Sequence, residues 1–190
     1  MSDKIKDAAE LFHSNHLHIP SKTMLLKGSV DEDMYELATK NLHILDQIND
    51  GTPITIKLNS GGGEVTQGLA IYDLIKACKS YVRIVVEGSC ESMATIILQA
   101  ADERVILKNS FLMLHIGTEQ YSQDHPENIQ RWKDKCAKDE ILCQDIYLSK
   151  IKEKKKRYTR KDLQKILTFD TILSAKESVA FGLVDVILER

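Results

Sequence analysis

Three residues of the sequence have side chains that together could carry out acyl transfer. Ser92 lies between two apolar segments, in GSCESMAT (88–95), and His115 lies near the end of the apolar stretch FLMLHI (111–116). Asp170 lies in LTFDTILS (167–174), just before another short apolar stretch. A serine hydroxyl becomes a nucleophile at neutral pH when an imidazole accepts its proton, and a carboxylate orients that imidazole. The three residue types therefore fit a serine hydrolase.

Each of these residues also has an ordinary structural interpretation. Ser92 occupies the position of a helix N-cap, which is a common place for serine. His115 at a strand end is more typical of a structural histidine, and Asp170 suits a loop or capping acid. The GxSxG motif of other hydrolases, which exposes the nucleophile on a strand-to-helix turn, is not matched by Gly88 to Ser92. The triad is a hypothesis that depends on the fold bringing the three together.

A second feature is the glycine-rich stretch NSGGGEV (59–65), which lies between a predicted strand and a predicted helix. Consecutive glycines tolerate positive φ, so backbone amides can turn outward and hold a phosphate or an oxyanion. Gly63 is followed by Glu64, Val65 and Thr66 with no lysine, so the P-loop pattern is excluded, and the GxGxxG pattern fails as well. A tight turn with no ligand is the alternative.

The predicted elements alternate between strand and helix, which favours right-handed crossovers, a mainly parallel sheet and the α/β class. A capping box is predicted at Ser29 and Glu32, and another at Ser174 and Glu177 with a helix end at Gly182. The strands are expected at 23–28, 53–59, 83–88, 104–108, 111–116 and 183–188. The helices are expected over 29–48 with an end at 49–51, over 65–79 and 92–102, after Pro126, after Thr159, and over 174–182.

The domain organisation is predicted to be an N-terminal arm, residues 1–20, and one catalytic-type domain, residues 21–190. His13, His16 and His18 are close enough in sequence to suggest a metal site. No cysteine or acidic ligand pattern accompanies them, so a flexible or packed polar arm is favoured over a metal centre.

The bulk properties exclude several classes of function. The chain has 190 residues and a formal net charge of −2, which gives no electrostatic reason for a nucleic acid or membrane partner. The basic run KIKEKKKR (150–157) is interpreted as the solvated end of a helix. The four cysteines show no metal-ligand spacing and are read as free thiols. With no signal peptide and no apolar run of about 20 residues, we expect a cytoplasmic protein.

Four motifs in order along the chain resemble the proteolytic subunit of the Clp protease. They are LNSGGGEVTQGLAIYD (58–73), GSCESMA (88–94), NSFLMLHIG (109–117) and FDTILSAKESVAFGLVD (169–185). The corresponding family patterns read roughly INSPGGxVTAGLAIYD, GQAASMG, NSRxMIHQP and RDxFMSAxEAxxYGLID. The resemblance runs from about Leu25 to the end of the chain.

This resemblance implies a role for each candidate residue. Ser92 falls on the family's nucleophile, His115 on the general base and Asp170 on the orienting acid, while Gly63 and Met93 fall on the two amide donors of the oxyanion hole. It also implies a ClpP/crotonase-like α/β fold with repeated β-β-α units and a long protruding handle helix. The resemblance further implies a serine endopeptidase that acts on peptides or unfolded proteins inside homo-oligomeric, heptameric rings. No metal or organic cofactor is implied.

The resemblance also implies an unfoldase partner of the Clp-type AAA+ ATPase class. Thr55 and Lys57 stand where the family has the tyrosines of its ATPase-docking pocket, which removes an aromatic anchor. Glu91 places a charge beside the nucleophile, where the family has a small residue. Two other functions are considered: a non-catalytic ring subunit, and an acyl-CoA enzyme of the crotonase type. The complete set of triad residue types argues against both.

Overall fold

The computed structural model describes residues 14–48, 50–117 and 125–189, and its main feature is an eight-stranded sheet. Five strands, in the order β2-β3-β4-β5-β8, are parallel to one another. The strands are β1 (Leu17–His18), β2 (Thr23–Val30), β3 (Ile54–Gly63), β4 (Val82–Glu91), β5 (Glu103–Leu107), β6 (Phe111–Leu114), β7 (Thr171–Ser174) and β8 (Val186–Leu188). The helices are η1 (Ile19–Ser21), α2 (Glu32–Gln47), α3 (Val65–Ala77), α4 (Met93–Leu98), α5 (Pro126–Lys154), α6 (Arg160–Leu167) and α7 (Ala175–Phe181).

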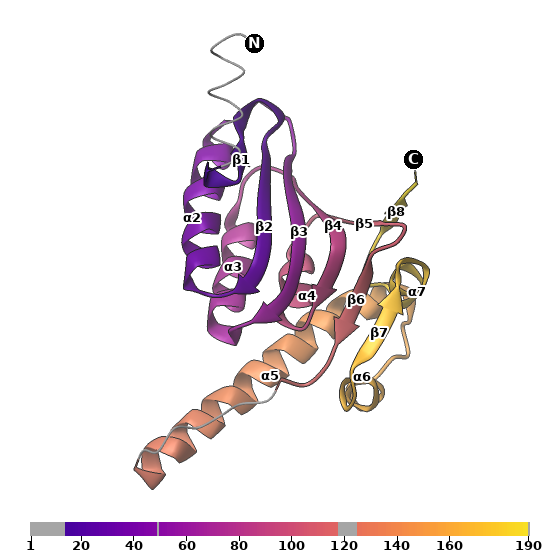
Figure 1. Ribbon diagram of the computed structural model, residues 1–190. Coiled ribbons are helices and arrows are strands. Elements are labelled where there is room, and N and C mark those ends of the chain that lie inside the picture. The colour runs from indigo at the N-terminus through magenta and orange to yellow at the C-terminus, as the bar shows by residue number, and fades with distance from the viewer. Residues whose placement is uncertain (1–13, 49, 118–124, 190) are drawn as a thin grey trace.

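The α/β class and the mainly parallel sheet are as the sequence predicted. Each of the first three units contains one strand and one helix, whereas two strands, β5 and β6, precede α5. Helices α2, α3 and α4 lie together on one face of the sheet, and the opposite face of β2 to β5 is turned toward the viewer in Figure 1. Side chains alternate along each strand, so fully buried Leu26, Ile56 and Ile84 face the helices and form the core.

Two of the predicted helix caps are found where they were expected, and one is not. Ser174 and Glu177 form a reciprocal capping box at α7, which ends at Gly182 with φ 94°. The predicted capping box at Ser29 and Glu32 is wrong, because Ser29 lies within β2 and Asp31 caps α2 by accepting from the Met34 amide at 3.0 Å. The predicted end of this helix includes Asn49, which lies outside the described residues.

Several strands also differ from the prediction. Strand β3 continues through the glycines to Gly63, because these residues pair with the end of β2. Strand β7 was missed; it is only four residues long and pairs with β6. The last strand, β8, begins at Val186 rather than at Leu183, which is fully buried ahead of it.

The segment before β2 takes part in the sheet. Leu17 is buried, and Leu17 and His18 pair antiparallel with β2. His13 lies outside the described residues, and His18 Nδ1 is within 2.6 Å of Ser21 Oγ. Within residues 14–48, 50–117 and 125–189, no group of three or more His, Cys, Asp or Glu side chains is arranged to hold a metal ion.

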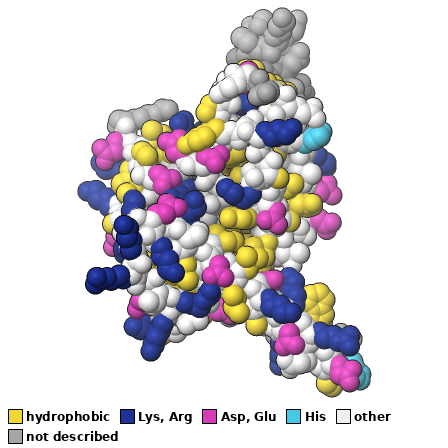
Figure 2. Space-filling model, turned by 180° about the vertical axis from the view of Figure 1, so that it is seen from behind, with side chains coloured by type: hydrophobic (Ala, Val, Ile, Leu, Met, Phe, Trp, Pro, Cys, Tyr) yellow, Lys and Arg dark blue, Asp and Glu magenta, His cyan; other side chains and the backbone are white. Residues whose placement is uncertain are grey.

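The long helix α5 reaches well beyond the sheet, as Figures 1 and 2 show. Its 29 residues give a length of about 43 Å at a rise of about 1.5 Å per residue. This length is consistent with the expected handle. Near its C-terminal end, Lys154 donates to the Val179 carbonyl at 2.7 Å, and Lys155 lies over the Phe181 ring, 4.1 Å from its centroid. These two lysines of the basic run therefore contact their own chain.

Acidic side chains are interspersed among the other basic side chains of the surface. All four cysteines are free thiols. Figure 2 shows Lys and Arg side chains with Asp and Glu among them on the side where α6, α7 and the end of α5 lie. The described helices include none that is both long and apolar enough to cross a membrane.

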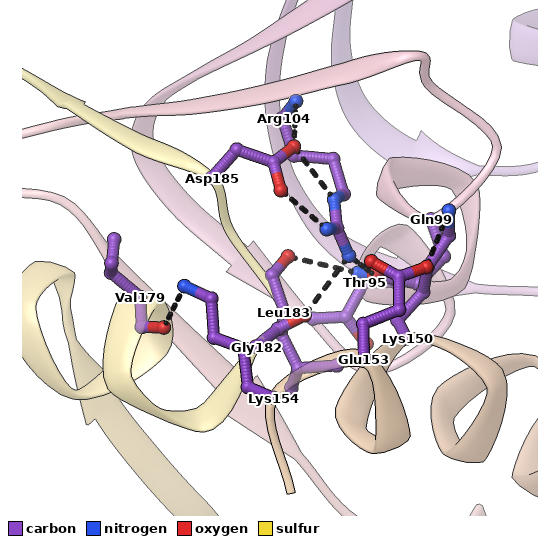
Figure 3. Close-up of polar contacts among 10 residues, drawn as sticks. All are labelled: Thr95, Gln99, Arg104, Lys150, Glu153, Lys154, Val179, Gly182, Leu183 and Asp185. Carbon is purple, nitrogen blue, oxygen red and sulfur yellow. Dashed lines mark hydrogen bonds and ion pairs between the residues drawn. The ribbon is translucent and has the colours of Figure 1, made fainter. Parts of the chain in front are cut away.

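A buried arginine joins α4 to the C-terminal part of the chain (Figure 3). Arg104 is 3% exposed, and its guanidinium donates to Asp185, to Gln99 Oε1 at 2.8 Å and to the Gly182 carbonyl at 3.1 Å. Gln99 in turn donates to the Leu183 carbonyl at 3.3 Å. Burial raises the pKa of the Asp185 carboxyl, but the hydrogen bonds and charge of Arg104 outweigh this and hold the pKa below its ordinary value.

We predict that Asp185→Asn lowers the free energy of unfolding by about 2 kcal/mol, because it leaves the buried Arg104 charge without its counterion. In the wild type the folded pKa of Asp185 is depressed. Its stabilisation is therefore complete above the unfolded pKa, about 3.9, and is lost as the pH falls through the folded pKa. Denaturant unfolding between pH 7 and pH 3 should show a steeper acid loss for wild type than for Asp185→Asn. Glu36→Gln, at an exposed ion pair, is the control and should change little.

Candidate active site

Ser92 lies at the point where β4 ends and α4 begins. Its backbone has φ 49° and ψ −123°, a conformation that residues other than glycine rarely adopt. Such a residue costs on the order of 1–3 kcal/mol unless its surroundings hold it, and strained residues cluster at functional sites. The Ser92 amide donates to the Met113 carbonyl of β6 at 2.8 Å, and its own carbonyl accepts from the Thr95 amide at 3.0 Å.

The side chain of Ser92 does not cap α4. No side-chain capping hydrogen bond is formed, although Ser92 is the N-cap residue. Instead, Ser92 Oγ lies 2.8 Å from His115 Nε2, which is hydrogen-bonding distance. The strained turn thus directs the hydroxyl toward the histidine, which is the arrangement that a serine nucleophile requires.

His115 and Asp170 are brought together by the antiparallel pair of β6 and β7. The register pairs Leu114 with Thr171, so His115 follows β6 directly opposite Asp170, which precedes β7. His115 Nδ1 lies 3.2 Å from Asp170 Oδ1. The structure therefore brings Ser92, His115 and Asp170 into one chain of contacts, with the imidazole between the hydroxyl and the carboxylate.

The side chains of His115 and Asp170 differ in their exposure to solvent. The His115 side chain is 30% exposed and that of Asp170 is 68% exposed. The carboxylate therefore lies at the rim, where solvent screens its interaction with the imidazole. The geometry fits an orienting acid in a site that opens directly to solvent in the single chain.

Gly62 is in direct contact with the turn at Ser92. A Cβ at this position would lie 2.7 Å from the Glu91 carbonyl oxygen, 2.8 Å from Ser92 Cβ and 3.0 Å from the Met93 amide nitrogen. Two of those three atoms are backbone, so they cannot move aside easily. Its φ of 87° also favours glycine. The central glycine of the stretch therefore lets β3 approach the candidate nucleophile.

The two candidate oxyanion donors lie on either side of this contact. Met93 is the first residue of α4, so its amide has no acceptor within the helix. The Glu64 amide donates to Val30 on β2 at 2.7 Å. Gly63 pairs with Val30 of β2 and directly follows Gly62, the residue that contacts the Ser92 turn. Both candidate donors therefore belong to segments that lie beside Ser92.

Cys90, two residues before Ser92, is the nearest alternative nucleophile, and its environment excludes it. It is fully buried in the core. Burial, with a smaller effect of Glu91, raises the pKa of its thiol well above the ordinary value. The reactive thiolate is therefore scarce at neutral pH. Cys143 behaves in the same way, since burial raises its pKa to about 11.

Several residues that position Ser92 were not found from the sequence. Thr95 Oγ1 lies 2.6 Å from the Ser92 carbonyl and also contacts the hydroxyl of Tyr147 on α5. Gly68 of α3 faces Met93, and a Cβ there would lie only 2.3 Å from Met93 Cγ. The sequence signal that could have indicated these close contacts is the presence of glycine at positions 62 and 68 of a strand–helix unit.

Comparisons with known proteins identify the family and the fold of the chain. The Clp protease family model matches residues 9–190. The chain belongs to the Clp protease family. A point mutant of ClpP1 from Listeria monocytogenes is similar in structure, with a TM-score of 0.79 and 26% sequence identity. The match covers 90% of this chain and 94% of that one. The ClpP-like fold expected from the sequence is thereby confirmed.

Within the Clp protease fold, the elements that position the site come from two parts of the chain. Strand β3, the end of β4 and α4 carry Gly63, Ser92 and Met93, whereas His115 and Asp170 adjoin the β6–β7 pair. The bond from the Ser92 amide to Met113 joins the two parts. Correct alignment therefore depends on the packing of this strand pair against β4.

We predict that Ser92→Gly is more stable than Ser92→Ala by about 1 kcal/mol. Both variants lose the hydroxyl, but only glycine adopts φ 49° and ψ −123° without strain. The strain relieved, on the order of 1–3 kcal/mol, exceeds the roughly 0.4–1 kcal/mol that glycine costs through unfolded-chain entropy. Denaturant unfolding at one fixed protein concentration measures the difference. An alanine variant as stable as the glycine variant would mean that the turn is not strained.

We predict that Gly62→Ala disrupts the site while Gly61→Ala does not. A methyl group at 62 overlaps Glu91, Ser92 and Met93, whereas a Cβ at 61 meets nothing within 4 Å. The first variant should lose at least about 2 kcal/mol of unfolding free energy, as expected for a strained backbone position, together with the reactivity of Ser92. Thermal unfolding and active-site labelling of the two variants provide the comparison, and equal behaviour would contradict the close approach.

Proposed function

We propose that this member of the Clp protease family is a serine endopeptidase that cleaves peptides or unfolded proteins through an acyl-enzyme. The observation that carries the proposal is the continuous contact from Ser92 Oγ through the His115 ring to Asp170. Three residues far apart in sequence meet in the order that nucleophilic catalysis needs. The strained backbone of Ser92 supports the same role.

In the proposed mechanism, His115 Nε2 accepts the proton of Ser92 as Oγ attacks the carbonyl carbon of the scissile peptide bond. Asp170 keeps the proton of the imidazole on Nδ1 and stabilises the imidazolium that forms. The amides of Gly63 and Met93 donate to the oxyanion of the tetrahedral intermediate. His115 then protonates the leaving amine, and a water molecule activated by the same histidine releases the acyl group. The mechanism needs no metal or organic cofactor.

We also propose that the protein works as a homo-oligomeric ring. The Clp protease family typically forms rings with Clp-type ATPases. Three large apolar side chains of α5, Trp132, Ile141 and Leu142, are between 47% and 57% exposed in the single chain. Such a set on one protruding helix is typical of a helix that packs against another copy. A cytoplasmic chamber made of heptameric rings is the assembly that we infer.

The surface that would dock a Clp-type AAA+ ATPase carries ion pairs in this chain. Lys57 forms an ion pair with Glu87 at 2.8 Å, and Arg83 forms another with Glu103, on the sheet face that is not covered by α2 to α4. Thr55 and Lys57 occupy the positions where the family has the aromatic residues of its docking pocket. An ion-paired surface binds a hydrophobic loop poorly, because the charges would lose solvent. A partner ATPase would therefore need polar contacts at this surface.

The decisive test is labelling by a fluorophosphonate, followed by intact mass and peptide mapping. Wild type should gain one adduct at Ser92. Ser92→Ala should gain none, and His115→Ala should react at least about a thousandfold more slowly, because the hydroxyl loses its base. Ser89→Ala, three residues earlier on β4, is the matched control and should react like wild type. A folded wild type without an adduct would instead favour the non-catalytic ring subunit.

A further inference from the structure

A cleft of about 480 Å3 opens at the carboxyl ends of β2 and β3. It arises because the strands lose regular pairing at this level: the β2–β3 register shifts between Lys27 and Ser29, and Gly28 has φ 91°. Ligands of open α/β sheets bind outside the carboxyl ends of the strands. The lining residues are Lys27, Gly28, Ser29, Asn59, Ser60, Gly61 and Gly62.

The polar groups that line this cleft are suited to donating hydrogen bonds to an anion. Lys27 is exposed and forms no ion pair with any residue that the structure describes. Ser60 is 2% exposed; its Oγ accepts from the Gly62 amide at 3.1 Å, which leaves its hydroxyl proton to donate. Asn59 Oδ1 accepts from the Ser89 backbone amide at 3.2 Å, which leaves the side-chain NH2 group of Asn59 to donate.

No carboxylate competes for Lys27 within the cleft. None of the seven lining residues is Asp or Glu. Glu87, on the neighbouring strand β4, is already paired with Lys57 at 2.8 Å. The cleft therefore combines one free cation with neutral donors, which is the set of groups that binds a carboxylate.

The cleft is joined to the candidate nucleophile through Gly62. This residue lines the cleft, and its missing side chain is what allows contact with Ser92 Cβ and the Met93 amide. A peptide whose carbonyl lies at Ser92 Oγ would pass over Gly62 and could place a nearby group in the cleft. The two sites are thus separated by one backbone residue.

We propose that this cleft is a substrate subsite that binds a carboxylate of the peptide, with Lys27 as the residue that sets the preference for negative charge. The inference rests on the proposed peptidase function and deepens it. The carboxylate comes either from an acidic side chain close to the scissile bond or from the C-terminus of a short peptide. Lys27 is a specificity-determining residue and takes no part in the chemical step.

The test measures binding rather than cleavage, so it does not depend on catalysis. In the Ser92→Ala background, fluorescence anisotropy would compare three kinds of otherwise neutral peptide. The first is a series with an amidated C-terminus in which Glu occupies each position in turn. The second is the same series with Gln instead of Glu, and the third has Gln and a free C-terminal carboxylate. We expect a carboxylate peptide to bind about two- to fivefold more tightly than the neutral one, as a single partly exposed ion pair provides. Raising the salt concentration should reduce the difference.

Variants of Lys27 decide the origin of the preference. Lys27→Ala should abolish it, Lys27→Arg should retain it, and Lys40→Ala, an exposed lysine on α2, should behave like the parent. Equal binding of charged and neutral peptides by the parent, or a preference that survives Lys27→Ala, would overturn the inference. A change of oligomer size in Lys27→Ala without a change in peptide preference would also overturn it. Labelling of Ser92 by a fluorophosphonate is a separate measurement, so a failure of the subsite and a failure of the peptidase function are distinguishable.

Discussion

The close approach of two backbones at Gly62 is the constraint on which the candidate site depends. Strand β3 can run beside the Ser92 turn only because residue 62 has no Cβ, since one would lie within 3.0 Å of three atoms of residues 91–93. The absence of a side chain at residue 62 therefore determines whether the candidate nucleophile and the candidate oxyanion donors can lie side by side.

The strain at Ser92 is held by contacts on three sides. Its amide is bound to β6, its carbonyl to Thr95, and its side chain to His115. At the other end of α4, Gln99 is bound to the buried guanidinium of Arg104. The short helix is therefore anchored at both ends, which is how a protein can maintain an unfavourable φ without relaxing it. The buried Arg104–Asp185 ion pair and the contacts of Ser92 therefore hold the same short helix.

Much of the fold could be predicted from the sequence, because its signals are local. β-branched alternation predicted β3, a short apolar run predicted β4, and the Ser174–Glu177 spacing predicted the start of α7. Ser29 failed as a cap because it lies within β2 and pairs with Gly62 of β3, while Asp31 is better placed to reach the Met34 amide. Strand β7 failed because four residues carry almost no periodic signal, and its partner β6 lies about 60 residues earlier in the chain.

The candidate site could be predicted only in part. The residue types of Ser92, His115 and Asp170 suggested a triad, but their roles came from a family resemblance, since no spacing rule joins residues so far apart in sequence. Their contact depends on the register of β6 and β7, which is a tertiary property. The cleft at Lys27 arises from irregular pairing of β2 with β3, and the sequence shows only glycines there. Long-range register is the information that a single sequence lacks.

The β6–β7 pair has a consequence for the lifetime of the assembled site. Strand β7 has four residues, it pairs with β6, and the side chain of Ile172 within it is 65% exposed. Short, poorly covered segments of this kind open with free energies far below that of global unfolding, and their amides exchange with solvent hydrogen correspondingly fast. Each such opening would carry Asp170 away from His115 while the central sheet stayed intact. The fraction of time spent in the competent arrangement is therefore set by a local equilibrium, and any partner surface that covers β7 would shift it.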